Sequence, residues 1–130
     1  SFMIYTNTQA LVGRSIPEEQ LKMLNRVLEG DIMIRQIHDV KGIDMGNGMV
    51  RYKAEVDVDG RELTRYYLEK HNLKDLFEEM QNAKTSQEFE LFMLRHGENI
   101  VDCLGEQVDR IERELRAQHP EVRHVDLEVL

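Results

Sequence analysis

Three side chains near the end of the chain combine donor types that zinc prefers with a spacing that brings them to one side. His124, Asp126 and Glu128 occupy alternate positions, and alternate side chains of a β-strand point to the same face. Neutral imidazole and carboxylate groups are common zinc ligands. The pattern therefore allows a metal site on a strand, although an exposed strand that binds no metal has the same pattern.

The lone cysteine is the other group that could do chemistry. Cys103 has no second cysteine to pair with, which excludes an intramolecular disulfide and cysteine-rich zinc sites. A nucleophilic thiol needs an adjacent base or a nearby cation, but its sequence neighbours include Glu98 and Asp102. His96 precedes it across a glycine, so a Cys–His dyad is the alternative. The sequence therefore predicts no catalytic residues and a protein that is not an enzyme.

The composition is that of one acidic globular domain. The chain has 130 residues, a net charge of −8 and 41% hydrophobic residues, and this length suits a single core. Nucleic-acid binding depends on Lys and Arg that contact phosphates; the sequence has no basic cluster, so we expect no nucleic-acid partner. No stretch has the ~20 apolar residues that cross a bilayer. Residues 1–12 are mildly apolar, and we expect them to be the remnant of something longer.

The first half of the chain predicts one helix and a β-hairpin. A capping box at Ser15–Glu18 and leucines at helical spacing predict a helix over Pro17–Glu29. β-Branched residues predict a strand over Ile32–Asp44, and regular alternation predicts its partner over Met49–Val58. The residues Gly46-Asn47-Gly48 between them favour a tight hairpin turn.

The second half is predominantly helical and ends in a strand. Arg61–Leu68 is compatible with a third strand or with the start of a helix. Apolar stripes follow, and Gly97 is expected to interrupt them. The stripe over Val101–Leu115 predicts a long helix packed on its own sheet rather than a dimer seam. Val122–Leu130 predicts a closing strand, which should lie parallel to a strand of the hairpin and complete an α+β sandwich.

Several stretches together resemble the C-terminal domain of the cation diffusion facilitators. The resemblance covers essentially the whole chain, and two of the stretches are typical of the animal mitochondrial branch of the family. The general stretches are Leu11–Pro17, Ile37–Val40 and Val122–Glu128, and those of the mitochondrial branch are Arg51–Gly60 and Phe92–Ile100.

The resemblance implies a metallochaperone-like (ferredoxin-like) αββαβ fold. In the family, this domain follows a membrane region that exchanges zinc for protons, and it forms a homodimer that holds two transporter halves together. Residues 1–12 would be the end of the last membrane helix or its exit linker, and residues 13–130 the soluble C-terminal domain. The chain departs from the family at about residues 61–90, which we expect to be an inserted segment, helical or partly β, before the last long helix.

The resemblance also adds a metal ligand. In some members the histidine of a His-Asp-Leu segment binds zinc between domains, and His38 matches it. The matching part of the second strand offers Glu55 but no histidine. A zinc site of His38, His124 and Asp126 is the resulting hypothesis, and the alternative is that His38 and Asp39 form a surface pair. Zinc is compatible with the family but not required by it.

Two functions follow as hypotheses. The first is a regulatory and dimerisation domain of a zinc/proton antiporter of the mitochondrial membrane, on the matrix side, with the endoplasmic reticulum or nucleus as other locations. Its partners would be a second copy and the membrane region of the same chain. The alternative is a coactivator-like protein-interaction module with no metal role, which contacts a protein partner through the insert and its acidic helices. Exposed apolar residues over Leu73–Met80 would favour this alternative.

Overall fold

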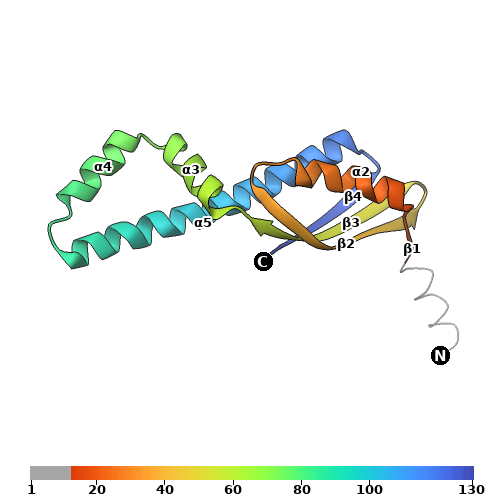
Figure 1. Cartoon of the computed structure of the whole chain (residues 1–130), viewed down its shortest axis with the longest axis horizontal. Coiled ribbons are helices and arrows are strands. Elements are labelled where there is room, and N and C mark those ends of the chain that lie inside the picture. The colour runs from red at the N-terminus through yellow and green to blue at the C-terminus, as the bar shows by residue number, and fades with distance from the viewer. Residues whose placement is uncertain (1–12) are drawn as a thin grey trace, which may run out of the picture. The chain divides into compact units, whose positions relative to one another are not determined.

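The chain forms two compact units in a computed structural model that describes residues 13–130. The expectations for residues 1–12 lie outside the described residues. One unit comprises residues 13–58 and 110–130, and the other comprises residues 59–109. The elements of the first unit are β1 (Arg14–Ser15), α2 (Glu18–Glu29), β2 (Ile34–Gly46), β3 (Met49–Val58), the C-terminal part of α5 (Ser86–Gln118) and β4 (Val122–Val129) (Figure 1).

The strands of the first unit form one mixed sheet in the order β1-β2-β3-β4. β2 and β3 are an antiparallel hairpin, and β4 lies parallel to β3. At the hairpin turn Asn47 and Gly48 have φ angles of 56° and 74°, which an Asn-Gly pair adopts readily. The α+β, ferredoxin-like αββαβ arrangement is thus confirmed, with β1 as an additional short edge strand.

The core of this unit lies on one side of β3. Tyr52, Ala54 and Val56 are completely buried, whereas Arg51 and Lys53 between them are exposed. This alternation is what a sheet covered on one face requires. The Tyr52 hydroxyl donates to the Asn25 side chain at 2.7 Å, so its polar end is satisfied within the apolar layer. The buried residues that complete the layer come from both helices and β4: Leu24, Leu28, Ile111, Leu115 and Val122.

A β-bulge in β4 corrects the predicted alternation of that strand. Val50 pairs with Val122, but the next residue of β3, Arg51, pairs with His124. Arg123 is therefore the extra residue, and it reverses the side to which the following residues point. As a result Val122 belongs to the core side, although the uninterrupted alternation had placed it on the same side as His124.

α2 begins one residue later than predicted, and the predicted capping box is wrong. The N-cap is Pro17, and no side chain caps the helix. Ser15 instead belongs to β1, where it pairs with Ile43, and the Ile16 amide donates to the Gly42 carbonyl at 3.0 Å. Sheet pairing therefore holds Ser15 in the extended backbone and keeps its side chain out of the helix start.

A charged fork joins α5 to the turn that follows α2. The Arg110 guanidinium donates to both carboxylate oxygens of Asp31, at 2.8 and 2.9 Å, and Asp31 also accepts from the Met33 amide at 2.9 Å. Burial alone would raise the pKa of Asp31, but these hydrogen bonds and the positive charge outweigh it, so the pKa is lowered. The pair is bidentate and partly buried, which makes it stronger than an ordinary surface salt bridge.

The second unit is helical: α3 (Gly60–Lys70), α4 (Leu73–Asn82) and the N-terminal part of α5. Arg61–Leu68 is therefore part of a helix and not a third strand. The Asp59 carboxylate accepts from the amides of Arg61 and Glu62 at 3.0 and 3.2 Å, so Asp59 is the N-cap of α3. No helix within residues 13–130 combines the length and the apolar character of a membrane span.

α5 is a single helix of 33 residues, and the predicted interruption at Gly97 is wrong. One glycine lowers helix propensity by only about 1 kcal/mol, which its neighbours readily outweigh. Ile111 and Leu115 are buried as predicted, but Val101 at the start of the predicted stripe is 65% exposed. The buried line instead continues through Gln107 and Cys103 in steps of four residues.

The glycines of α5 give a stability prediction. Gly97→Ala and Gly105→Ala are each expected to stabilise the chain by up to about 1 kcal/mol, because alanine favours the helix and an added Cβ would meet no atom within 4 Å. Gly42→Ala is the control of opposite sign: its Cβ would collide with Ile16 and lie 3.1 Å from the Leu21 side chain, and overpacking costs about 1–3 kcal/mol. Urea unfolding measures all three variants. A Gly97→Ala chain less stable than the wild type would contradict this view of α5.

Candidate functional site on the open face of the sheet

The metal candidates lie together on one face of the sheet, opposite the core. Cross-strand neighbours point to the same side of a sheet, and the register places Glu55 between His38 on β2 and Glu128 on β4. We call this side the open face, because within the first unit the buried apolar layer lies on the other side. Its residues are His38, Arg51, Lys53, Glu55, His124, Asp126 and Glu128.

Ion pairs between β3 and β4 hold most of the charges on the open face. Arg51 donates to one Asp126 oxygen from Nε at 3.0 Å and from a terminal nitrogen at 2.9 Å, and Lys53 lies 3.7 Å from Glu128. Such exposed pairs contribute little to stability, but each of the four side chains is already engaged in an ion pair. Asp126 could bind a metal only after Arg51 had been displaced from it.

The two histidines of the predicted zinc site are far apart within one chain. His38 pairs with Glu55, whereas His124 pairs with Arg51, four residues along β3 and on its other side. With a rise of about 3.3 Å per residue and strands about 4.8 Å apart, their Cα atoms are separated by roughly 16 Å. Zinc ligands lie about 2 Å from the ion, so one chain cannot bring both histidines to a single zinc.

The described part of the chain contains no group of three or more His, Cys, Asp and Glu side chains that could hold a metal ion. The structure therefore places His38, His124 and Asp126 on a common face without converging them. Asp39, next to His38, has a φ of 51° at a bulge in β2, a conformation that Asp tolerates better than most residues. No hydrogen bond joins the side chains of His38 and Asp39, so the structure does not show the predicted surface pair.

Cys103 has the environment of a packing residue. Its side chain is buried, and burial followed by repulsion from Glu106 raises the pKa of the thiol. A raised pKa disfavours the thiolate that nucleophilic chemistry needs. The structure does not form the alternative Cys103–His96 dyad, because the His96 ring contacts Tyr67 and Glu79 instead.

The second unit contains a polar network that the sequence did not suggest. The Tyr67 hydroxyl lies 2.6 Å from His96 Nδ1, and Asn99 donates to the same hydroxyl at 3.3 Å. His96 Nε2 lies 3.4 Å from Glu79, which also pairs with Arg95. Because three helices contribute, no spacing within one segment could have pointed to this network. The sequence left open whether residues 61–68 form a strand or a helix. Tyr67 reaches His96 on α5 from the helix α3.

The network fits a neutral His96 ring. Tyr67 accepts from Asn99 and can direct its own hydrogen to Nδ1, which leaves the ring proton on Nε2, 3.4 Å from both Glu79 and the Arg95 guanidinium. Burial, and then repulsion by Arg95, lowers the pKa of His96 from its ordinary value of 6.5. A second ring proton would make Tyr67 accept from both Asn99 and Nδ1 and would place a positive ring beside the Arg95 guanidinium.

His96 gives a prediction for the pH dependence of stability. Its pKa is lower in the folded chain than in the unfolded chain, so the unfolded state binds the proton more readily and stability falls as the pH drops below about 6.5. The urea concentration at the unfolding midpoint is expected to decrease when the pH is lowered from about 7.5 to about 5.5. His96→Gln is expected to make that decrease smaller. His71→Gln, which changes an exposed histidine of the same unit, is the matched control. Equal pH dependence in His96→Gln and wild type would exclude this role.

Known proteins match the chain over its full length. It is 58% identical over 130 residues to the human protein named proton-coupled zinc antiporter SLC30A9, mitochondrial, and 56% identical to the Xenopus laevis protein of the same name. It is 30% identical over 98% of its length to metal tolerance protein C4 of Arabidopsis thaliana. The chain spans only 23% of the human and Xenopus laevis proteins and 28% of the plant protein. No family model and no solved structure matches it.

These matches agree with the family resemblance noted in the sequence. They involve all, or nearly all, of the described residues in both units, including α3 and α4. From end to end, the chain is thus similar to one part of a zinc antiporter of the cation diffusion facilitators.

Proposed function

We propose that this chain is the regulatory and dimerising C-terminal domain of a zinc/proton antiporter. The observation that carries the proposal is the 58% identity over every residue of the chain to proteins named proton-coupled zinc antiporters. In this view, ion movement belongs to the rest of the protein. The present chain supplies contacts with a second copy and with the membrane region of the same polypeptide.

The open face of the sheet is the surface that we assign to the second copy. A two-fold dimer uses the same patch on both partners, and the open face offers alternating cationic and anionic side chains that can pair across such an axis. The paired charges Arg51–Asp126 and Lys53–Glu128 are exposed and weak, so they can exchange partners at little cost.

Zinc binding by the predicted ligands would require both copies. His38 and His124 are too far apart in one chain for a single ion, but a second open face opposite the first can supply the missing donors. A metal that binds only the dimer stabilises the dimer by mass action. Zinc and dimerisation would then be thermodynamically linked, and the dimer itself would not depend on zinc.

The location of the domain belongs to the same proposal. Its vertebrate relatives are named as mitochondrial, and we assign the antiporter to a mitochondrial membrane with this domain on the matrix side. Zinc would be the transported substrate of the whole protein as well as a ligand of the dimer.

A zinc titration that follows heat and mass together tests the proposal. The 130-residue chain is expected to be dimeric at high concentration, and zinc is expected to shift the monomer–dimer equilibrium towards the dimer with micromolar affinity or tighter. His38→Ala should abolish the zinc-dependent shift but keep the metal-free dimer. His71→Ala, which removes a histidine outside the open face, should behave as the wild type.

Each part of the proposal has its own negative result. A chain that remains monomeric at all concentrations, with or without zinc, would remove the dimerising role. Zinc binding without a change of mass would show that the ligands lie within one copy and would contradict the bridging arrangement. A zinc-induced dimer that persists in His38→Ala would exclude this histidine as a ligand.

A further inference from the structure

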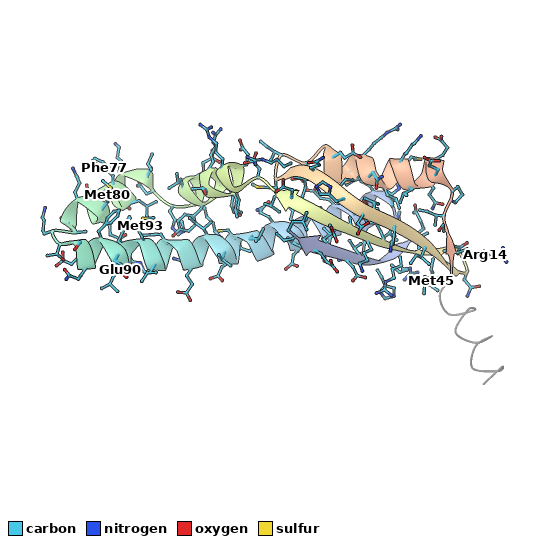
Figure 2. The ribbon with its side chains drawn as sticks, turned by 60° about the horizontal axis from the view of Figure 1, so that its bottom comes forward. Arg14, Met45, Phe77, Met80, Glu90 and Met93 are labelled. Atoms are coloured by element: carbon cyan, nitrogen blue, oxygen red, sulfur yellow. The ribbon has the colours of Figure 1, made fainter. Side chains whose placement is uncertain are left out.

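The N-terminal part of α5 has an exposed apolar seam on the side that faces away from α4. Leu91, Leu94 and Val101 are 66%, 60% and 65% exposed. Figure 2 shows Met93 between α5 and α4, and His96, three residues further along, contacts Glu79 of α4. At 100° per residue, Leu94, Glu98 and Val101 lie on the side of α5 opposite His96 and Asn99, whereas Leu91 lies at the edge of the seam, beside Glu79 and Asn82 of α4. Leu94 and Val101 are therefore not part of the packing between α4 and α5.

The spacing of the seam is that of a helix that pairs with another helix. The residues Leu91, Leu94, Glu98, Val101 and Gly105 follow one another in steps of three, four, three and four. These are the a and d positions of a heptad repeat, which point to a single partner helix. Three large apolar side chains left exposed in this pattern are typical of an interaction surface.

Acidic side chains surround the seam and decide which partner fits it. Glu98 lies within the seam, and Glu90 and Asp102 flank it. Among residues 59–109 there are twelve Asp and Glu against six Lys and Arg. The one basic residue beside the seam, Arg95, already pairs with Glu79. A partner helix therefore needs apolar residues at heptad spacing and basic residues opposite Glu98 and Asp102.

The same charges argue against two other occupants. In a two-fold pairing of the seam with its own copy, Glu98 lies between the apolar residues of the seam and would face Glu98 of the second copy, and like charges in contact oppose association. An anionic membrane surface would likewise repel this face. A basic amphipathic helix is the one of these occupants that the charge pattern favours.

Gly105 adds an independent indication. A Cβ built on Gly105 would meet no atom within 4 Å, so nothing within the described residues requires a glycine there, although glycine weakens a helix. At the end of the seam, a residue without a side chain lets another helix approach closely.

We propose that the seam of Leu91, Leu94, Glu98, Val101 and Gly105 is a docking site for a basic amphipathic helix of a partner protein. The partner helix places leucine-like side chains against the three apolar residues and Lys or Arg against Glu98 and Asp102. This site lies within the second unit and is independent of the open face, so it does not rest on dimerisation or on zinc.

A model peptide tests the seam directly. The probe is a fluorescently labelled peptide of about three heptads with leucine at a and d and lysine at the flanking positions, and binding to the 130-residue chain is followed by anisotropy. A second peptide of the same composition, with its leucines out of heptad spacing, measures attraction by charge alone. We expect binding of about micromolar affinity for the first peptide and at least tenfold weaker binding for the second.

Variants of the chain locate the binding surface. Leu91→Ser with Val101→Ser is expected to weaken binding at least tenfold, whereas Ile32→Ser is the matched control, because it removes an equally exposed side chain, 67% exposed, from the first unit. Glu98→Lys should weaken binding of the basic peptide and strengthen binding of a peptide that has glutamate in place of lysine. Because all these side chains are exposed, helicity measured by circular dichroism should remain that of the wild type.

Four results would overturn the proposal. The first is equal binding of the heptad and the rearranged peptide, and the second is unchanged binding to the double serine variant. The third is a wild-type dimer that the double serine variant converts to a monomer, which would assign the seam to a second copy. The fourth is capture of the chain by vesicles of anionic phospholipid that the same variant abolishes, which would assign it to a membrane.

Discussion

The parallel pairing of β4 with β3 is the constraint on which the rest of the structure depends. Parallel neighbours cannot be joined by a tight turn and need a long crossover connection. Here the crossover runs from Val58 to Val122 and contains three helices. The last of these, α5, supplies Ile111 and Leu115 to the core that covers the sheet. The connection therefore also contributes to the core. A change that loosens β4 therefore also loosens α5.

Two local features fix this crossover in a single arrangement. The bulge at Arg123 turns His124 and Asp126 to the open face while Val122 stays in the core. Without it, the register would place either the apolar or the charged residues of β4 on the wrong side. The fork between Arg110 and Asp31 then ties α5 to the turn after α2. Because the fork is partly buried, removal of one partner would leave the other charge poorly compensated.

The sequence predicted the elements of the first unit well, because each follows from a local pattern. The hairpin around Asn47 and the strand Met49–Val58 needed only turn chemistry and alternation. The errors arose where distant residues decide: Ser15 pairs with β2 instead of capping a helix, and the bulge at Arg123 has no local signature. The candidate site shows the same limit. The alternation along the strands predicted that His124 and Asp126 share one face. The separation of His38 from these two residues depends on the strand register, which only the folded sheet defines.

Burial is unequal along α5. Isolated helices gain little stability from hydrogen bonding alone, and packing of an apolar face provides most of it. The C-terminal part of α5 has this packing at Ile111 and Leu115, whereas no residue of α5 before Cys103 is fully buried. The N-terminal part therefore extends a helix that the core has already nucleated, and its own stability is the lower of the two. A helix that docked on Leu91 and Val101 would bury apolar surface where the chain buries least, so the free energy of docking would act chiefly on the part of α5 that opens most readily.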